Sequence, residues 1–477
     1  MFIKRLPSIQ EYITHLGNEL HLLDPNLSLS ILRQKWLSFT LSGMLLTGTL
    51  NWKGFERMSL GTYSFADLSW MFRKATLPWS DLLNASTSLL MRKYNLNEGV
   101  LVLDDTDLRR AKTTSRIYGT HKVYDKKTGG YFNGQCIMSL VLVTKTMTIP
   151  LGMRFYRPDP KYRAWEKADK LLIKAGVKPA DRPKPPERDP NFPSKEDIAL
   201  VQLGDFHRKH PDFIVKAVLA DAAFGTHSFM EGACKKAGCK QVISQLRENQ
   251  HVVVGNSSMP VKEYFSKREA TSQTVLVRGG KLAKMTVIPA RLVVKAHGVK
   301  RAVIAVKNEG EADFRYIVAT DMTWRDLDIL QGYTLRWLVE VVFQDWKTHE
   351  GWANLAKHPD EDGSVRGVIL SLLLDHALLL HPAQQTCFEN STPANTVGSL
   401  KRAAEGEAMF VFASEIASDV NPSRMVEQLA AKFKTYFPLS SSKKHMSGRD
   451  LGRQEPMPAL NHHAIIDLLD GMTVALA

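Results

Sequence analysis

Cysteine is scarce in this chain, which has only four among 477 residues: Cys136, Cys234, Cys239 and Cys387. Four scattered cysteines do not form the disulfide framework of a secreted domain, and no paired Cys or His residues stand at zinc-finger spacing. The N-terminal segment MFIKRLPSIQEY also lacks the apolar run of a secretory signal. We therefore expect a protein of a reducing compartment, the cytoplasm.

Long hydrophobic runs and nucleotide-binding loops are missing as well. The most apolar segment, residues 367–381, carries Asp375 and His376 in its middle and is too short to span a bilayer comfortably. It predicts a buried helix, and no membrane partner is expected. Neither G-x-x-x-x-G-K-[ST] nor G-x-G-x-x-G occurs, which argues against a nucleotide cofactor, and H-E-x-x-H is absent too.

Positive charge is what the chain has in excess. Lys and Arg number 63 against 49 Asp and Glu, which leaves a formal net charge of +14. Such an excess favours a polyanionic partner, either nucleic acid or an acidic membrane surface, and charge alone does not choose between them. The length exceeds the size at which one hydrophobic core stops growing, so several domains are expected.

Hydrophobic periodicity divides the first half of the chain into helical and strand-rich regions. Residues 1–95 alternate helical patterns with turns and predict an all-helical unit, which suits DNA binding or a purely structural bundle. From residue 99 the run GVLVLDDTD is typical of a buried strand that ends in acids, and residues 134–156 predict a hairpin. The basic stretch between them, residues 109–130, predicts an exposed loop.

A proline-rich segment follows the predicted hairpin. Residues 158–193 contain eight prolines and predict a surface excursion around one short helix. A capped helix from Ser194 then leads into the strand IVKAVLAD, and short alternating strands follow. Near the end, a loop is expected at 438–460 and a last helix at 462–471. The predicted domains are a helical unit (1–95), a first core part (96–249), a β-rich insertion (250–322), a second core part (323–385) and a C-terminal helical region (386–477).

The helix predicted over residues 333–347 carries the most informative pattern. Its members Tyr333, Arg336, Glu340 and Lys347 fall within a stripe roughly 60° wide at about 100° per residue. The rest of the cylinder is apolar, so we expect the helix to be largely buried. A carboxylate between cations and a phenol is costly to bury unless it binds metal and the cations meet phosphate. The alternative is a solvated face or an internal Arg–Glu pair.

Further acids stand at the ends of two predicted strands. Asp104 and Asp105 end the strand VLVL, and Asp221 ends the strand IVKAVLA. Oxygen ligands from three rigid elements suit Mg²⁺ or Mn²⁺, and two such ions about 4 Å apart can promote phosphodiester cleavage. Each acid alone is more readily explained as a helix cap or turn residue. Together with the 333–347 helix, the acids predict a two-metal site.

The order of these features resembles the DDE transposases of bacterial insertion sequences, specifically the family numbered four. Two aspartates at strand ends, a β-rich segment and YTLRWLVEVVFQDWK follow one another, and the last motif matches the Y-R-E-K signature of that family. The resemblance spans roughly residues 95–385. It implies an α/β fold, with an RNase H-like, five-stranded mixed-sheet core interrupted by a β-rich insertion and flanked by helical regions.

The resemblance implies a set of catalytic metal ligands. Asp105, Asp221 and Glu340 would hold two Mg²⁺ ions, which Mn²⁺ can replace. The first ligand of the family precedes Thr, which favours Asp105 before Thr106. Strand alternation alone does not decide between neighbours, so Asp104 stays open as the first ligand.

The resemblance also implies contacts with DNA. Tyr333, Arg336 and Lys347 would bind phosphates beside the scissile bond. Relatives stack an aromatic side chain from the strand before this helix on a flipped base, for which Tyr316 is the candidate and Trp324 the reserve.

The activity implied by the resemblance is cut-and-paste DNA transposition. It comprises metal-dependent cleavage at the insertion-sequence ends, with or without a hairpin intermediate, and strand transfer into target DNA. The expected partners are double-stranded DNA, as terminal inverted repeats and as target, and a second copy of the chain in the paired-end complex. The expected location is the bacterial cytoplasm, at the nucleoid when DNA is bound. The alternatives are an RNase H-like nuclease or resolvase without strand transfer, and a domesticated DNA-binding protein.

Overall fold

The structure is a computed structural model that describes residues 4–48, 50–125, 127–277 and 280–439. The chain forms two compact units, the larger made of residues 1–59 with 63–412 and the smaller of residues 60–62 with 413–477. The five domains expected from the sequence stay predictions.

The strands all belong to the larger unit. Their bounds are β1 (Glu98–Arg109), β2 (His121–Asp125), β3 (Gly130–Val143), β4 (Thr148–Tyr156), β5 (Ile214–Ala220), β6 (Val242–Leu246), β7 (His251–Val254), β8 (Ser257–Pro260), β9 (Thr271–Val277), β10 (Lys281–Val294), β11 (Val299–Asn308) and β12 (Arg315–Ala319).

The helices of the larger unit are α1 (Pro7–Leu23), α2 (Ile31–Leu46), α3 (Trp52–Met58), α4 (Phe65–Arg73), α5 (Trp79–Lys93), α6 (Pro160–Lys174), α7 (Lys195–Lys209), α8 (His227–Ala237), α9 (Val261–Ser266), α10 (Asp326–Thr334), α11 (Leu338–Thr348), α12 (Trp352–Leu355), α13 (Glu361–Leu379) and α14 (Pro382–Glu389). Helix α15 (Val397–Ala417) begins in the larger unit and ends in the smaller one, to which α16 (Pro422–Tyr436) belongs. The predicted helix at 462–471, and the loop predicted at 438–460 from residue 440 on, lie outside the described residues.

Five strands form the core of the sheet, in the order β4-β3-β1-β5-β6. Strand β1 is antiparallel to β3 and parallel to β5, and β5 is parallel to β6. This confirms the α/β fold class and the five-stranded mixed sheet expected for an RNase H-like core. The parallel strands are nearly continuous apolar runs because helices cover both of their faces.

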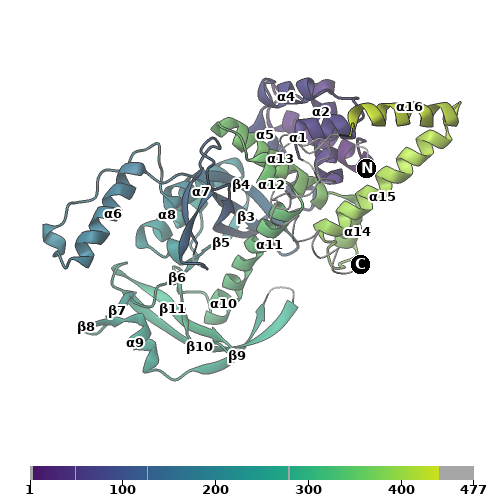
Figure 1. The fold of residues 1–477 in the computed structure, drawn as a ribbon. Helices are drawn as coiled ribbons and strands as arrows, with labels where there is room; N and C mark the ends of the chain where they lie inside the picture. The colour runs from purple at the N-terminus through teal and green to yellow at the C-terminus, as the bar shows by residue number, and fades with distance from the viewer. Residues whose placement is uncertain (1–3, 49, 126, 278–279, 440–477) are drawn as a thin grey trace, which may run out of the picture. The chain divides into compact units, whose positions relative to one another are not determined.

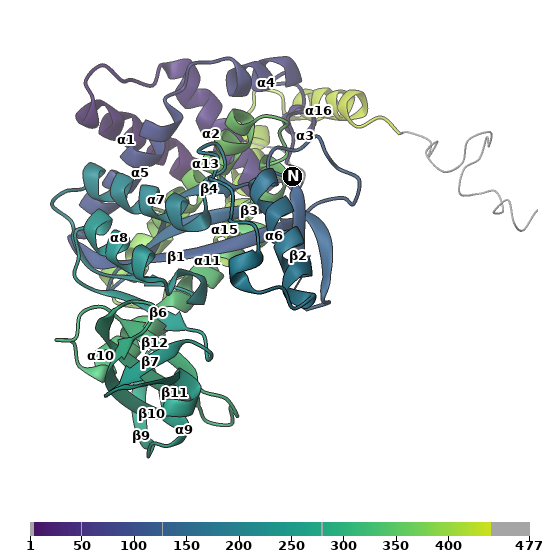
Figure 2. The ribbon, with the colours of Figure 1, turned by 90° about the vertical axis from the view of Figure 1, so that its left-hand side faces the viewer.

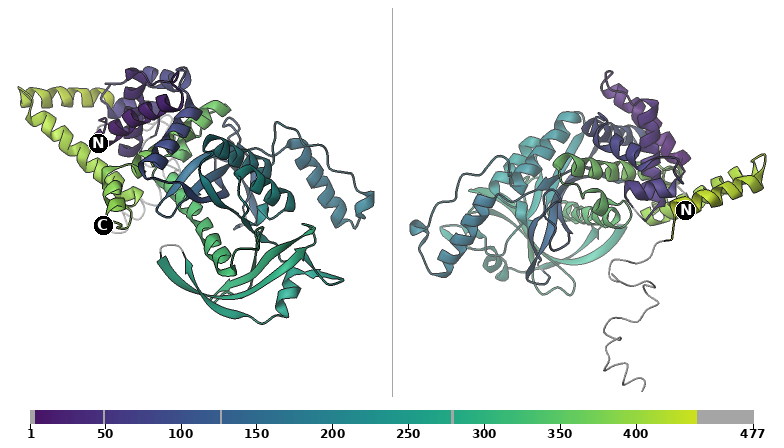
Figure 3. Two further views of the ribbon diagram at one scale, coloured as in Figure 1. Left: turned by 180° about the vertical axis from the view of Figure 1, so that it is seen from behind. Right: turned by 45° about the horizontal axis from the view of Figure 1, so that its top comes forward.

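The β-rich segment continues this core sheet. Strand β12 pairs with both β6 and β11, and the sheet runs on through β10, β7 and β8, with β9 paired to β10. The result is a 12-stranded sheet within the described residues. Figures 1 and 3 show the added strands at the end of the core away from α1–α5.

One expectation for the core is wrong, because residues 109–130 do not form only a loop. Strand β2 lies inside this stretch and pairs with β3, while β1 and β3 extend to meet it. Only Val123 is buried among the residues of β2, so the strand has almost no hydrophobic signal. Pairing with the longer β3 stabilises β2, and the paired strands project past the acids of β1.

Helices cover both faces of the core sheet (Figure 2). Helices α7 and α8 pack on the face that holds Leu101 and Leu103, whereas α10, α11 and α13 pack on the face that holds Val102. Side chains alternate between the faces of a strand, so neighbouring residues of β1 enter different layers. Helix α7 begins with the capping box predicted at Ser194 and Asp197.

The N-terminal helices pack around α13, which confirms that the apolar run at 367–381 is a buried helix. His376 of α13 is fully buried, bonded to Ser86 Oγ at 2.7 Å and to the Pro150 carbonyl at 2.8 Å. No single described helix is long and apolar enough to cross a membrane; α13 and α14 pass such a test only together, across a 50° bend.

Candidate active site

Strand β1 places Asp104 on the face covered by α10 and α11. The carboxylate of Asp104 accepts a hydrogen bond from Arg336 at 2.5 Å, so it lies directly beside the predicted signature helix. Thr106, two residues further along β1, shares this face and accepts a hydrogen bond from Lys347 at 2.6 Å. Alternation along one strand therefore presents two side chains to one helix.

Asp104 is held in an electrostatically strained environment. Burial raises the pKa of its carboxyl to about 7; Arg336 counteracts this rise, while the charges of Asp221 and Asp105 add to it. An isolated carboxyl in water titrates near 4. The carboxylate of Asp104 is therefore costly to keep ionised here, chiefly because it is buried.

Asp221 reaches the same place from the end of β5. Its carboxylate accepts the backbone N–H of Ala223 at 2.9 Å and caps the 3₁₀ turn Ala222–Phe224, while its carbonyl accepts the Ser244 hydroxyl at 2.6 Å. The cap and the bond to β6 fix the side chain. Burial is the main cause of the raised pKa of both Asp104 and Tyr333, and the charge of Asp221 adds to it in each case.

The predicted helix at 333–347 is present, with a local change of geometry. Helix α10 ends at Thr334, a 3₁₀ turn covers Leu335–Trp337, and α11 follows. The expectation that this helix is largely buried is wrong, because only one side faces the core, through Val339 and Val342 among others. The opposite side is open, and the side chain of Trp337 there is 49% exposed.

The four residues of the predicted stripe lie on the side that faces Asp104 and Thr106 or at its margin. Tyr333 accepts a hydrogen bond from Gln245 at 2.8 Å, and burial raises its pKa to about 12. Glu340 is exposed, and its charge acts on both Arg336 and Lys347. Burial lowers the pKa of Lys347, whereas the charge of Glu340 raises it. The stripe is therefore a charged surface that remains accessible at Glu340.

Asp105 lies on the opposite face of the sheet from Asp104. Its position therefore disagrees with the prediction that Asp105, in preference to Asp104, is the first metal ligand. Lys195 of α7 donates to its carboxylate at 2.7 Å, and the Cys136 thiol lies 3.5 Å from the same oxygen. The physical reason is strand alternation, because adjacent side chains of a straight β1 cannot both face α11. The structure brings Asp104, and not Asp105, together with Asp221 and the α10–α11 segment.

Asp105 also belongs to a second group of potential metal ligands. Asp105, Asp107 and Cys136 offer ligand atoms that all lie within 4.8 Å of one another. Lys195 already supplies positive charge there: although its burial lowers its pKa, Cys136 and Asp105 raise the pKa overall. Burial also raises the pKa of the Cys136 thiol, which disfavours the thiolate that binds metal.

The Asp104 side offers a different set of ligands, although its three acids do not form a cluster as close as the Asp105 group. Asp104, Asp221 and Glu340 offer carboxylate oxygens, the hard ligands that Mg²⁺ and Mn²⁺ prefer. The charge of Arg336 interacts with all three carboxylates. A divalent ion held there would favour the ionised form of Asp104, which its burial disfavours.

The structure changes the choice of base-stacking residue. Tyr316 of β12 is only 5% exposed and stacks on Phe265 at 5.7 Å between ring centroids. It is a core residue, so Tyr316 is wrong as a candidate for stacking on a base. Trp324 is half-buried in the segment before α10, within reach of Gly332. Trp337, which directly follows Arg336, is a further exposed aromatic residue of this segment that its apolar character in the sequence did not single out.

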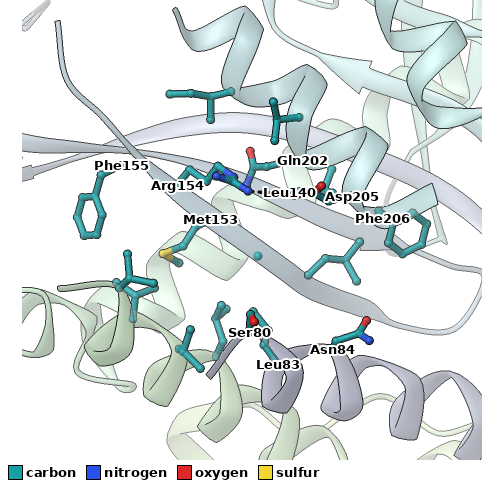
Figure 4. A pocket seen from close by; sticks show the side chains of 18 of the residues that line it. Ser80, Leu83, Asn84, Leu140, Met153, Arg154, Phe155, Gln202, Asp205 and Phe206 are labelled. Carbon is teal, nitrogen blue, oxygen red and sulfur yellow. Dashed lines mark hydrogen bonds and ion pairs between the residues drawn. The ribbon is translucent and has the colours of Figure 1, made fainter. Parts of the chain in front are cut away.

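A cavity of about 520 Å³ lies elsewhere, between α5, β4, α7 and α13. Figure 4 shows its labelled residues, with Arg154 and Asp205 paired at 3.0 Å on one side and Ser80 and Leu83 on the other. None of the three acids of the Asp104 side lines it. The candidate active site is therefore an open surface of the sheet and not this cavity.

A family profile described as "DDE superfamily endonuclease" matches residues 27–269, just over half of the chain. The chain belongs to the DDE superfamily of endonucleases. Endonucleases of this type use divalent metal ions, which agrees with the carboxylates on the Asp104 side. The matched range includes Asp104, Asp105 and Asp221 and ends before α11, so it does not reach Glu340.

A solved structure, a piggyBac transposase synaptic complex with hairpin DNA, is similar to this DDE endonuclease at 8% sequence identity. The similarity covers 93% of this chain and 86% of that one, with a TM-score of 0.40, and we draw no functional conclusion from a likeness of this size. Comparison with curated proteins gives no match.

Proposed function

We propose that this DDE endonuclease is a transposase that cuts DNA at the ends of an insertion sequence and joins them to target DNA. The observation that carries the proposal is the meeting of Asp104, Asp221 and the Arg336–Glu340 segment, which come from β1, β5 and α10–α11. The middle of β1, the end of β5 and one helical segment are rigid supports, as a site for phosphodiester chemistry requires. The proposed catalytic residues and metal ligands are Asp104, Asp221 and Glu340.

Two Mg²⁺ ions, replaceable by Mn²⁺, would activate the attacking oxygen and stabilise the leaving oxygen when bound. The chain contributes the ligands and the phosphate contacts. Asp104 would hold a cation in its ionised form, and a cation held there would compete with Arg336 for its carboxylate. The planar guanidinium can turn to a DNA phosphate, which it binds through two parallel hydrogen bonds.

Tyr333 and Lys347 would hold phosphates on either side of Arg336. Gln245 positions the Tyr333 hydroxyl, and Thr106 positions the Lys347 ammonium. Side chains positioned in this way lose little further freedom when a phosphate binds, which favours a well-defined position of the scissile bond. Trp324 and Trp337 are candidates for contact with a displaced base.

The finer assignment is to the insertion-sequence family numbered four, which the Y-R-E-K pattern of α10–α11 supports. It includes strand transfer by a freed 3′-OH, with or without a hairpin intermediate, and a homodimer that holds two inverted repeats. The net charge of +14 supports the binding of long double-stranded DNA and predicts strong salt dependence. We place this activity in the bacterial cytoplasm, at the nucleoid.

The test is Glu340→Gln in the full chain, assayed on duplex DNA that carries the sequences flanking the coding region. Cleavage with Mg²⁺ or Mn²⁺ should fall at least about a thousandfold, because a ligand is lost. Binding of the same DNA should stay within about twofold, since one exposed carboxylate is removed. The control is Glu269→Gln, an exposed acid of the insertion. Normal cleavage by Glu340→Gln would refute the assignment.

A nuclease that cuts without joining is the second candidate, and the match to an endonuclease profile favours it equally. The two candidates differ in one step. A duplex with a pre-cleaved 3′-OH end should be joined to a supercoiled plasmid by a transposase. Cleavage of intact ends without any joined product would establish the nuclease instead.

A further inference from the structure

The hairpin of β2 and β3 ends in two exposed aromatic rings. Tyr124 and Tyr131 are 52% and 65% exposed, and they stand directly opposite each other across the two strands. Their ring centroids lie 5.3 Å apart in an edge-to-face arrangement. A pair of this kind stabilises a hairpin, but a hairpin does not need its aromatic pair on the solvent side.

The strand register places both rings on the same face of the sheet as the candidate active site. Asp104 stands opposite Ser139 on β3, and Tyr131 lies eight residues before Ser139 on the same strand. Side chains alternate, so an even spacing puts Tyr131 on the face of Ser139 and Asp104. Tyr124, opposite Tyr131, shares that face, as do Lys122 and its partner Asn133. These four residues, Lys122, Tyr124, Tyr131 and Asn133, are called the hairpin face below.

The surroundings of the hairpin face are positively charged. Lys122 is exposed, and so are Lys112 and Arg116 in the loop before β2. Asn133 attaches that loop to the hairpin face, because its amide donates to the carbonyls of Ala111 and Thr114 at 3.0 and 2.7 Å.

The hairpin also carries an acidic side chain, Asp125, but a neighbouring arginine balances its charge. Asp125 pairs with Arg109 at 3.0 Å. The cations of the loop and of the hairpin face therefore favour the binding of a polyanion such as DNA.

We infer that the hairpin face binds the duplex DNA that leaves the active site. Eight residues of extended strand span about 26 Å, and B-DNA rises about 3.4 Å per base pair. The hairpin face should therefore meet the DNA backbone about seven to eight base pairs from the scissile phosphate. Lysines would contact phosphates, and the tyrosines would pack on sugars and donate their hydroxyls to phosphate oxygens. This inference rests on the proposed function, because it takes Asp104 as the site of cleavage.

The first test measures DNA affinity by fluorescence anisotropy, with the full chain and a duplex of the flanking sequences. Lys122→Gln should weaken binding several-fold and lower the slope of log K against log salt by about one, the value for one phosphate contact. Tyr124→Ala with Tyr131→Ala should weaken binding about tenfold, whereas Phe at both positions should retain most of it, because the rings remain. Thermal unfolding checks that each variant is folded.

The insertion offers a matched control hairpin. Leu276 and Leu282 form an exposed cross-strand pair on β9 and β10, and Lys284 lies opposite Thr274 on the same two strands. Leu276→Ala with Leu282→Ala, and Lys284→Gln, remove the same kinds of group from another hairpin of the same sheet. Equal losses of affinity in the two hairpins, or unchanged binding in the β2–β3 variants, would overturn the inference.

The second test locates the contact by hydroxyl-radical footprinting on a pre-cleaved duplex. Protection should appear about seven to eight base pairs from the cleaved end and disappear in the double Ala variant. A separate arm with a plain target duplex tells whether the hairpin face meets the element end or the target. If the double Ala variant loses protection in neither of the two arms, the inference is wrong. A natural chain without cleavage activity would refute the proposed function. The footprint could still be measured with such a chain, because protection of DNA requires binding and not catalysis.

Discussion

Asp104 and Asp105 are neighbours in the chain, yet they lie in two different environments. Asp105 faces α7, where the Lys195 ammonium meets its carboxylate at 2.7 Å. Asp104 faces α10–α11, where the single guanidinium of Arg336 is shared with Asp221 and Glu340. Both faces hold more acids than cations, but the Cys136 thiol stands among the potential ligands on the Asp105 side, whereas the Asp104 side offers carboxylates alone. The second environment is the one that a divalent ion would complete.

The largest difference expected between the two neighbours is in catalysis. Asp104→Asn should lower cleavage of flanking-sequence DNA by about a thousandfold or more, because it removes a proposed metal ligand. Asp105→Asn should lower it less than about tenfold, because its carboxylate points away from Arg336. Single-turnover cleavage at saturating DNA and Mn²⁺ measures both. A larger loss from Asp105→Asn would reverse the assignment of the first ligand.

A smaller difference is expected in the pH dependence of metal binding. The pKa of Asp104 is raised to about 7, so its proton competes with a cation below that pH. Only the ionised form binds, so Mn²⁺ affinity should rise roughly tenfold between pH 6 and pH 8 and then level off. Calorimetric titration with Mn²⁺ at several pH values measures this. Asp105→Asn should keep the pH dependence and Asp104→Asn should lose it; a flat profile in the natural chain would contradict the prediction.

The smallest effect expected is on the free energy of unfolding, through the ion pair of Lys195 with Asp105. Lys195→Met keeps the aliphatic stem and removes the ammonium, which leaves Asp105 and Asp107 without their cation. We expect a loss of about 1–2 kcal/mol, moderated by partial exposure to solvent. In the Asp105→Asn background the same substitution should cost less, as a double-mutant cycle followed by urea unfolding would show. Additive losses would mean that the two side chains do not interact.

Most elements of the fold could be predicted from the sequence because their periodicity is strong. The run GVLVL, the capped helix at Ser194 and the apolar run at 367–381 became β1, α7 and α13. Strand β2 was missed because it buries only one side chain and depends on β3, a partner that local pattern does not reveal. The resemblance suggested Tyr316 as a base-stacking residue, but its ring stacks on Phe265, a partner far away in the sequence.

The sequence by itself determined which residue types take part in the site and which elements carry them. It marked Asp221 at a strand end, and it marked Arg336 and Glu340 on one helix stripe, because these follow from spacing within single elements. Only the tertiary structure decided that Asp104, and not Asp105, meets that helix. Adjacent strand residues are equivalent until the two faces of the sheet are covered by different helices, and that covering is a property of the whole fold.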